Sequence, residues 1–494
     1  MNNKGKIFIA GAGPGDIELI TVKLQLTLSK ADVILYDYLV NKAMLLLCRN
    51  DAIQISVGKS GALESKHKFI QEDIHKLMIK YAKQGKVVLR LKGGDPFIFG
   101  RGSEECEEIA KTGIDFEVIP GISSAIAGPA YAGIPLTHRG ISRSVAIATG
   151  HLRKQEDSNN IKIPNADTIV FVMAIKNIAI IVNKFFNQEY PKETKCALIE
   201  NACSPAQRTF VTTLGDVCEV CDKNKVSPPA LFVVGDVIAL RENLAWYEKK
   251  PLFGKTFLVT RAQKQASGMS AALRELGAKV IEFPVIEIVR IKNAEEILLQ
   301  QGYLDKFTDI IFTSVNGVEI FFDILFKGEL DSRILFKKTI LSIGKVTANK
   351  LLQYGIKADI VPDIYQSEGI LQKLGQDLSK RKFLLPRAKD ARPFLIDEVR
   401  LRRGEIEELL LYQAKLPCEV FSIEDSARLD GICFTSTSTV INFCKINPNF
   451  KNTKVFAIGE ITAKSASDSG FKDIEISQQA TINSVVEKII EVTK

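Results

Sequence analysis

The stretch LRLKGGDPFIFGRGSEE, residues 89–105, joins an apolar, strand-like run to a loop that holds two adjacent glycines. Because Gly93 and Gly94 carry no side chain, a ligand can approach the backbone closely at this loop. Asp95 adds a carboxylate for hydroxyl or ammonium groups. The stretch therefore predicts a strand that ends in a ligand-binding loop, and such a loop suits a nucleoside with an amino-acid tail.

The same pattern extends over the first half of the chain. Apolar, β-rich runs alternate with helix-like segments from residue 5 to residue 250, and Gly or Pro marks the joins. This alternation favours an α/β fold. The other predicted strands have the sequences KIFIAGAG, ADVILYD, DFEVIPG, SVAIATG and TIVFVMA. Ligand sites in α/β folds lie where the carboxyl ends of strands meet loops, so we expect the site there.

The second half contains an internal repeat. Residues 309–322 (DIIFTSVNGVEIFF) are echoed by residues 430–443 (DGICFTSTSTVINF), and residues 342–355 (SIGKVTANKLLQYG) by residues 457–470 (AIGEITAKSASDSG). Duplicated strand–turn–helix units predict two similar α/β lobes that face each other. Ligands commonly bind in the cleft between such lobes.

A polar segment rich in lysine, EKKPLFGK, separates the two halves. The lone Trp246 closes the first half, and the run TFLVTRA starts a new strand. We therefore expect a junction near residues 248 to 253, with one module at 1–248 and another at 249–494.

The composition is that of a globular protein with two or more domains. The 494 residues carry a formal net charge of +8 and nine cysteines, and no run approaches the ~20 apolar residues of a membrane helix. Scattered cysteines suit a reducing compartment, so we expect an unprocessed, soluble, cytoplasmic protein without a membrane partner. The basic residues form no Lys/Arg-rich tail, so we expect no nucleic-acid partner. Charge alone does not identify the partner, and a carboxylate-rich substrate explains the positive charge equally well.

The loop GAGPGD, residues 11–16, resembles a dinucleotide-binding fingerprint only in part. Asp16 stands where the third glycine is needed for close helix packing, and Pro14 removes a backbone N–H donor. Both departures argue against a nicotinamide-dependent oxidoreductase. A plain strand-to-helix turn also fits this loop. For the whole chain, the net positive charge by itself is equally compatible with a protein that binds polyanions without catalysis.

Taken together, the sequence motifs of the first half are specific enough to indicate a protein family. GAGPGDIELIT, RLKGGDPFIFGRG, PGISSA, AYAGIPLTHR and SPPALFVVGDV follow one another across residues 5–247. In that order they resemble uroporphyrinogen-III C-methyltransferases, a branch of the tetrapyrrole methylases. The resemblance implies a fold of two lobes, about 1–135 and 136–248, usually in a homodimer. It also implies S-adenosyl-L-methionine as methyl donor and S-adenosyl-L-homocysteine as product.

The same resemblance assigns roles to single residues. It implies an acid/base pair of Asp37 and Lys59. The chain departs from the usual family pattern at VMA (172–174) and NAC (201–203), although backbone contacts would survive both changes. The implied contacts with the methyl donor are Pro14, Gly93, Gly94, Asp95, Ile98, Ser123, Ser124, Met173 and Ala202.

The substrate of that family carries many carboxylates, and guanidinium groups match carboxylate geometry. Basic residues in or beside the quoted strings are therefore candidates for substrate binding. Methylation by an activated sulfonium needs mainly alignment and no metal. The histidines show no zinc spacing, and Cys218 and Cys221 have metal or redox spacing but no second pair. The candidates for substrate binding are Arg90, Lys92, Arg101, His138, Arg139 and Arg143.

Strings of the second half, among them DIIFTSVNGV, LLPRAKDARPFL and FAIGEITA, resemble uroporphyrinogen-III synthases over residues 252–490. The resemblance implies one lobe at 252–287 plus 417–494 and an inserted lobe at 288–416. It implies Tyr412 as a proton donor in a cleft of hydroxyls and backbone N–H groups. The candidate substrate contacts there are Thr313, Ser314, Thr347, Ser367, Ser436 and Thr462.

The two resemblances imply consecutive reactions. The synthase would close hydroxymethylbilane into uroporphyrinogen III, with inversion of ring D and loss of water. The methyltransferase would then methylate that product at C2 and C7 to give precorrin-2, an intermediate of the siroheme and cobalamin branch.

Overall fold

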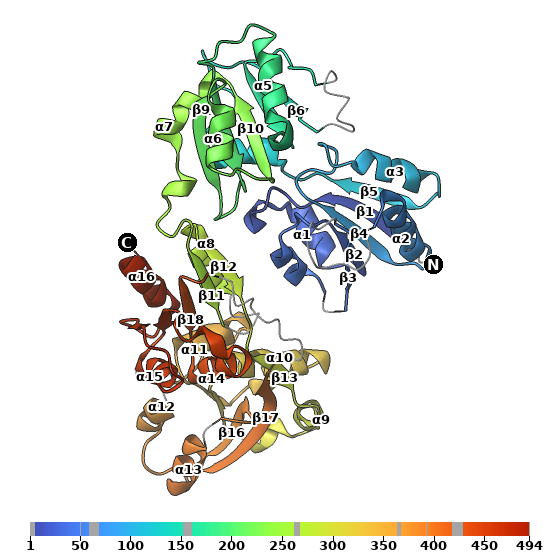
Figure 1. Ribbon diagram of the computed structural model, residues 1–494. Helices are drawn as coiled ribbons and strands as arrows, with labels where there is room; N and C mark the ends of the chain where they lie inside the picture. The colour runs from blue at the N-terminus through green and yellow to red at the C-terminus, as the bar shows by residue number, and fades with distance from the viewer. Residues whose placement is uncertain are drawn as a thin grey trace. The chain divides into compact units, whose positions relative to one another are not determined.

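The computed structural model confirms the α/β prediction (Figure 1). The chain divides into two compact units, each described by itself: Met1–Thr256 with Ala272–Lys279 and Thr493–Lys494, and Phe257–Ala271 with Val280–Val492. The structure describes residues 5–49, 51–58, 69–151, 161–260, 267–362, 367–391, 393–416 and 428–493.

The first unit begins with a five-stranded parallel sheet in the order β3-β2-β4-β1-β5. Helices α2 (Gln71–Lys83) and α3 (Gly102–Ala110) pack on one face, and α1 (Val22–Leu28) packs on the other. Because all strands run the same way, their carboxyl ends meet at one edge. The strands are β1 (Lys6–Gly11), β2 (Val33–Tyr36), β3 (Ile53–Ser56), β4 (Val87–Lys92) and β5 (Asp115–Ile119).

A second, mixed sheet of the first unit has the order β6-β7-β10-β8-β9. Helices α5 (Ile178–Phe186) and α6 (Val217–Lys223) cover one face (Figure 1). Helix α4 (Ser124–Tyr131) packs on the other face, so it joins the two lobes although it follows β5 directly. The strands are β6 (Val145–Thr149), β7 (Thr168–Val172), β8 (Lys195–Glu200), β9 (Arg208–Thr213) and β10 (Ala230–Val234).

An aromatic cluster holds the segment after β10 against α4. The Tyr131 ring lies 5.1 Å from the Trp246 ring and 4.6 Å from the Tyr247 ring, centroid to centroid. The Trp246 indole N–H donates to the carbonyl of Ala130 at 3.0 Å. Short helix α7 (Arg241–Leu244) precedes this cluster, which ties the end of the first half to its own lobe.

The second unit contains two further five-stranded sheets, in the orders β12-β11-β18-β19-β20 and β13-β17-β16-β14-β15. The chain passes from the first to the second between β12 and β13 and returns between β17 and β18. The strands are β11 (Thr256–Val259), β12 (Lys279–Glu282), β13 (Glu287–Arg290), β14 (Asp309–Phe312), β15 (Thr339–Ser342), β16 (Lys382–Ala388), β17 (Glu405–Lys415), β18 (Gly431–Phe434), β19 (Val455–Ala457) and β20 (Ile474–Ile476).

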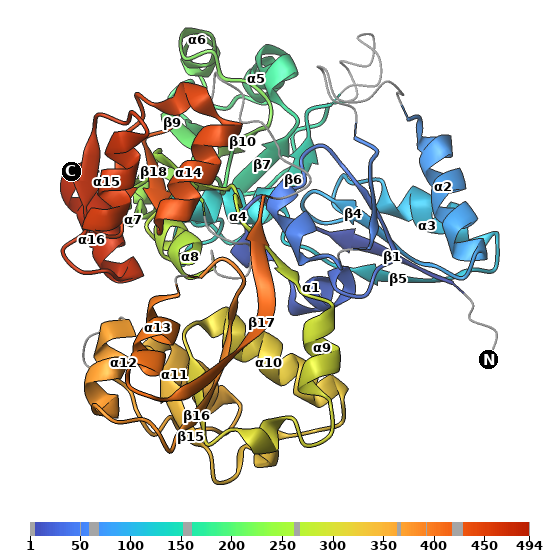
Figure 2. The same ribbon diagram turned by 90° about the horizontal axis from the view of Figure 1, so that it is seen from below.

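Helices cover both faces of the sheet that contains β14. Helices α9 and α10 pack on one face, and α12 and α13 pack on the other (Figure 2). The helices of the second half of the chain are α8 (Ser267–Glu275), α9 (Asn293–Leu298), α10 (Val315–Lys327), α11 (Lys345–Gln353), α12 (Ser367–Leu374), α13 (Phe394–Leu401), α14 (Thr437–Ile446), α15 (Glu460–Asp468) and α16 (Ile482–Thr493).

The sequence repeat corresponds to repeated structure. Strand β14 leads into α10 as β18 leads into α14, and β15 leads into α11 as β19 leads into α15. In both sheets these two strands are parallel neighbours. Each lobe of the second unit therefore presents two helix N-termini at one sheet edge.

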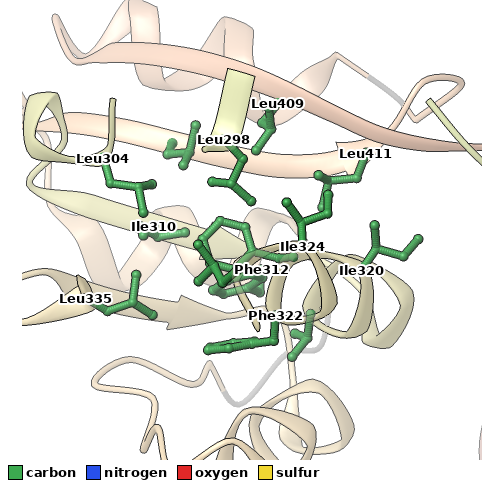
Figure 3. Packing of buried hydrophobic residues seen from close by; sticks show 14 of the residues in the cluster. Leu298, Leu304, Ile310, Phe312, Ile320, Phe322, Ile324, Leu335, Leu409 and Leu411 are labelled. Atoms are coloured by element: carbon green, nitrogen blue, oxygen red, sulfur yellow. The ribbon is translucent and has the colours of Figure 1, made fainter. Parts of the chain in front are cut away.

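Aromatic packing between β14 and α10 forms the centre of one core. The Phe312 ring is fully buried and lies 5.3 Å from the Phe321 ring and 6.4 Å from the Phe322 ring. Figure 3 shows Phe312 among the side chains of this cluster.

In the described ranges, every helix is too short or too polar to span a bilayer. The cysteines described there are all free thiols.

Replacing Phe312 by alanine removes a buried ring and leaves a cavity that the packed helix cannot fill. We expect Phe312→Ala to lower the free energy of unfolding by about 3–5 kcal/mol, measured by urea denaturation with circular dichroism. Phe336→Ala is the matched control, because this ring is 77% exposed and its loss should change stability by less than about 0.5 kcal/mol. Equal losses in the two variants would contradict this description of the core.

Candidate functional site

Two glycine-containing loops meet at the carboxyl edge of the parallel sheet. The amide of Gly13, after β1, donates to the carbonyl of Gly94 at 3.1 Å, and the amide of Gly94 donates to the carbonyl of Gly13 at 2.7 Å. The amide of Ala12 donates to the carbonyl of Lys92 at 2.7 Å. Backbone groups therefore build this edge, as the sequence predicted for loops that follow strands.

A third glycine completes the edge. A Cβ atom placed on Gly121 would lie 2.3 Å from the Gly94 oxygen and 2.7 Å from the Gly11 Cα. Real Cβ atoms do not approach that closely, so Gly11 and Gly121 need glycine for the loops to touch. Gly94 favours glycine for a different reason, its positive φ of 67°. We call Gly11, Gly94 and Gly121 the glycine contact.

Asp95 holds this arrangement together from within. Its Oδ1 accepts from the amides of Phe97 at 2.8 Å and Ile98 at 3.2 Å, and its Oδ2 accepts from the amide of Gly121 at 3.0 Å. The sequence suggested a carboxylate aimed at a ligand. The structure shows that the carboxylate binds three backbone amides of its own unit, which fixes the course of the loop.

The other predicted contacts for a methyl donor fall around the glycine contact. Ser123 caps α4 and Ser124 begins it, and a Cβ on Gly94 would lie 3.8 Å from the Ser123 Cα. Ile98 is 43% exposed beside them. The second lobe approaches at Gly15, where a Cβ would lie 3.8 Å from the carbonyl oxygen of Ala202. Pro14 lies in the same loop.

Met173 follows β7 and is 49% exposed, with a positive φ of 54°. Asn201 and Cys203, on either side of Ala202, also have positive φ values, 49° and 60°. Such conformations are uncommon outside glycine and cluster at functional loops. The loops after β7 and β8 therefore both contain residues with an uncommon backbone conformation. The residue types in these segments do not predict it.

Sequence reasoning missed the role of Asp16. Its Oδ2 accepts from the Tyr131 hydroxyl at 2.8 Å, and its Oδ1 accepts from the amide of Glu18 at 2.9 Å. The Gly15 carbonyl accepts from the Asn41 amide at 2.8 Å. Asp16 thus links the first glycine loop to α4 of the neighbouring lobe, which explains a carboxylate where a dinucleotide fingerprint has glycine.

Asp37, one member of the predicted acid/base pair, directly follows β2. Its Oδ1 accepts from the Arg90 guanidinium at 2.5 Å, and its side chain is 30% exposed. Lys59, the other member, lies outside the described residues.

The predicted substrate role of Arg90 and Lys92 needs correction. Both side chains are buried, with exposed fractions of 2% and 4%, and both donate to Oε1 of Glu105, at 3.2 Å and 3.0 Å. Burial lowers the pKa of the Lys92 ammonium, and the neighbouring Arg90 lowers it further. Arg90 and Lys92 therefore neutralise carboxylates inside the lobe, and their charged groups are already paired there.

The remaining basic candidates of this unit lie at the surface. Arg101 has a positive φ of 59° and pairs with Glu104 at 2.6 Å. The backbone of His138 bonds to Ser142, and its side chain is exposed, as are those of Arg139 and Arg143. In the described parts of the chain, Arg139 has no ion-pair partner.

In the second unit, the carboxyl ends of β14 and β17 bring Ser314 and Tyr412 together. Their hydroxyl oxygens are 2.9 Å apart, and Ser314 also caps α10 by accepting from the amide of Gly317 at 3.0 Å. Tyr412 is only 6% exposed. Burial raises the pKa of its phenol, although hydrogen bonds from Ser314 and Asn316 oppose that rise.

The other hydroxyl candidates occupy equivalent positions of the repeat. Thr313 precedes Ser314, and Ser436 caps α14 as Ser314 caps α10. Thr347 and Thr462 are the third residues of α11 and α15 and are each 5% exposed. Ser367 begins α12, but its side chain lies outside the described residues. Helix N-termini favour anionic groups, so this edge suits a polyanionic ligand.

Within the described residues, His, Cys, Asp and Glu side chains form no group of three that could hold a metal ion. The residues at both sheet edges are instead hydroxyls, backbone amides, carboxylates and basic groups. Proton transfer and binding of anionic groups are the chemistry that such sets perform.

Two families of known proteins match the two halves. Residues 6–218 match the family described as "Tetrapyrrole (Corrin/Porphyrin) Methylases". Residues 267–487 match the family described as "Uroporphyrinogen-III synthase HemD".

Relatives agree with these matches. The "Porphyrin biosynthesis protein HemD" of Ruminiclostridium josui is 34% identical over 504 residues, covering 99% of this chain and 98% of that protein. The "Uroporphyrinogen-III C-methyltransferase" of Methanocaldococcus jannaschii is 46% identical over 47% of this chain and 97% of its own length. The "Siroheme synthase" of Azotobacter vinelandii is 44% identical over 49% of this chain, which spans about half, 52%, of that relative. This chain therefore belongs to both families: its first half is a tetrapyrrole methylase and its second half is a uroporphyrinogen-III synthase.

Proposed function

We propose that this chain performs two consecutive steps of tetrapyrrole biosynthesis. The second half converts hydroxymethylbilane to uroporphyrinogen III, with inversion of ring D and loss of water. The first half then methylates uroporphyrinogen III at C2 and C7 to give precorrin-2. The observation that carries the proposal is the presence of both families in one chain, with 34% identity to a porphyrin biosynthesis protein over nearly the full length.

The residues around the glycine contact fit S-adenosyl-L-methionine as the methyl donor. Positions Gly93 and Gly94 leave the backbone bare, and a Cβ on Gly15 would meet only carbonyl oxygens, at 3.7 and 3.8 Å. Ile98, four residues after Gly94, and Met173, directly after β7, are exposed apolar groups. When bound, this molecule supplies an electrophilic methyl carbon. We propose that the groups holding it are Pro14, Gly93, Gly94, Asp95, Ile98, Ser123, Ser124, Met173 and Ala202.

Asp37 is suited to remove the protons that leave the macrocycle after carbon methylation. Its carboxylate is partly exposed, and the Arg90 guanidinium orients its Oδ1. A positioned base of this kind contributes about 10²–10⁴-fold to a rate. We propose Lys59 as its acid partner and Arg101, His138 and Arg139 as receptors for substrate carboxylates.

Tyr412 and Ser314 are suited to the loss of water in the synthase. We propose that the Tyr412 phenol donates its proton to the departing hydroxyl, while Ser314, 2.9 Å away, orients the phenol. Thr313, Thr347, Ser367, Ser436 and Thr462 then hold the flexible bilane together with the helix N-termini. Conformational control of the chain matters most here, because departure of the hydroxyl is already assisted by the pyrrole.

Three further proposals concern the molecule as a whole. We propose a cytoplasmic location, since nine scattered cysteines suit a reducing compartment. We propose a homodimer formed through the methylase half. We also propose that the modules meet near residue 248, where the aromatic cluster of Tyr131, Trp246 and Tyr247 ends the first half.

Incubation of the full chain with hydroxymethylbilane and methyl-labelled S-adenosyl-L-methionine tests the proposed function. We expect mass spectrometry to detect a cyclic tetrapyrrole carrying two labelled methyl groups on carbon. Uroporphyrinogen I without label, or nicotinamide binding in preference to the methyl donor, would contradict the proposal.

Tyr412→Phe removes the proposed proton donor and keeps the ring. We expect kcat for cyclisation to fall at least about tenfold, measured by a coupled fluorescence assay, while methylation of supplied uroporphyrinogen III is unchanged. Because burial raises the pKa of Tyr412, the phenol keeps its proton as pH rises through the ordinary tyrosine range, so no alkaline loss should arise from it below about pH 10.

Tyr303→Phe is the matched control for that variant. Tyr303 lies in the same lobe, is 4% exposed and donates its hydroxyl to Glu407 at 2.8 Å. Equal effects of the two substitutions on cyclisation would show that any buried phenol gives the same loss, and Tyr412 would have no special role.

Arg139→Glu tests the proposed receptor for substrate carboxylates. We expect KM for uroporphyrinogen III to rise about tenfold, because repulsion replaces attraction at an exposed cation, while KM for the methyl donor stays within about twofold. Steady-state kinetics with each reactant varied separately measures both constants. Lys223→Glu, an exposed charge reversal on α6, is the control. A parallel rise of the two KM values would contradict a role in substrate binding.

A further inference from the structure

A buried cluster of charges lies behind the proposed base of the methylase half. It comprises Asp37, Arg90, Lys92 and Glu105, two cations and two carboxylates, which we call the ion cluster. Arg90 and Lys92 are two positions apart on β4, so both side chains point to the same face of the sheet. Helix α3, which carries Glu105, packs on that face. The exposed fraction of the Glu105 side chain is 0%, that of Arg90 is 2% and that of Lys92 is 4%. Only Asp37, at 30%, reaches the surface.

Glu105 is the centre of the ion cluster. Its Oε1 accepts from Arg90 Nε at 3.2 Å, from Lys92 Nζ at 3.0 Å and from the side-chain amide of Gln71 at 2.9 Å. Its Oε2 is buried and has no hydrogen-bond partner within the described residues. The cations Arg90 and Lys92 lower the pKa of its carboxyl group against the opposing effect of burial.

Arg90 connects this centre to the surface. One terminal nitrogen donates to the carbonyls of Leu35 at 3.4 Å and Leu91 at 3.2 Å, and the other donates to Asp37 Oδ1 at 2.5 Å. The guanidinium is planar, so Glu105 on one side and two carbonyls in the middle fix the direction in which it meets Asp37. Glu105 and Asp37 therefore act on one rigid cation from opposite ends.

Stability alone gives a poor account of the ion cluster. Buried ion pairs are often no more stabilising than apolar residues of the same volume, and an unpartnered buried oxygen adds an unfavourable contribution. The place of the cluster is more informative. The Lys92 carbonyl accepts a hydrogen bond from the Ala12 amide, and Lys92 directly precedes Gly93. Asp37 follows β2, the strand next to β4. The cluster thus lies directly beneath the loops of the glycine contact.

We propose that Glu105 is a positioning residue for carbon methylation, acting through Arg90 to hold the Asp37 carboxylate in its reactive orientation. This inference rests on the proposed methylase function and adds to it a residue that has no contact with the reactants. Arg90 binds two carboxylates, Glu105 inside the lobe and Asp37 at its surface. Because Glu105 already neutralises part of the Arg90 charge, Arg90 orients Asp37 without holding it as its sole counter-ion.

Glu105→Gln tests the proposal, since glutamine keeps the shape of the side chain and removes its charge. We expect kcat for methylation of supplied uroporphyrinogen III to fall at least about tenfold, with KM for S-adenosyl-L-methionine within about twofold of wild type. Cyclisation of hydroxymethylbilane by the same preparation should be unchanged, which reports that the synthase half is folded. The unchanged KM for S-adenosyl-L-methionine, with an unchanged thermal unfolding transition, reports that the methylase half is folded.

A double-mutant cycle separates positioning from general destabilisation. Arg90→Lys keeps the charge but cannot span from Glu105 to Asp37, so it should lower kcat by a similar factor. Because both residues act through one contact with Asp37, the double variant should be no slower than the slower single variant. Multiplied losses in the double variant would overturn the proposal. If Glu105→Gln does not fold, Arg90→Lys alone tests the proposal by the same criterion: a lower kcat with an unchanged KM for S-adenosyl-L-methionine.

Asp32→Asn is the matched control. Asp32 lies at the opposite edge of the same sheet, is 22% exposed and pairs with Arg49 at 2.8 Å. It should lose stability without losing methylation rate. Equal losses of kcat in Asp32→Asn and Glu105→Gln, or full activity of Glu105→Gln, would overturn the inference while wild-type methylation upholds the proposed function. A wild-type chain that transfers no methyl group would overturn the proposed function, and the inference with it.

Discussion

The close approach of bare backbone at Gly11, Gly94 and Gly121 is the constraint on which the methylase half depends. A single added Cβ at Gly121 would lie within 2.3 Å of a carbonyl oxygen. The loops after β1, β4 and β5 touch at these atoms, and hydrogen bonds between Gly13 and Gly94 and from the Gly121 amide to Asp95 join them further. The backbone that a ligand would meet at this edge is therefore held in place by neighbouring backbone and by the Asp95 carboxylate.

The two halves use a parallel sheet edge in different ways. In the methylase half, one edge collects glycine loops and a carboxylate with a buried counter-charge behind it. In the synthase half, the edge is duplicated, and each lobe offers two helix N-termini capped or lined by hydroxyls such as Ser314 and Ser436. The first arrangement suits alignment of two reactants. The second suits a flexible, many-charged chain that must be held in one conformation.

Prediction from sequence succeeded where local chemistry determines the outcome. Glycine pairs after strands and the repeat of residues 309–322 in residues 430–443 are local signals, and the structure shows loops and matching strand–helix units at those places. It failed for Arg90 and Lys92, which were expected to meet a substrate. Both lie beside glycine loops in the sequence, but alternation along β4 turns their side chains inward, toward Glu105 on a helix that no motif connects to them.

The sequence by itself determined the fold class, the family of each half and the loops that carry the sites, because these depend on periodicity and on residue types at fixed spacing. Only the tertiary structure decided which charges are buried together. Asp16 reaches Tyr131 across 115 positions, and Arg90 reaches Asp37 across 53. Whether a charged side chain meets solvent or another charge is settled by the packing of distant segments, since burial and pairing are properties of the folded surroundings and not of the residue.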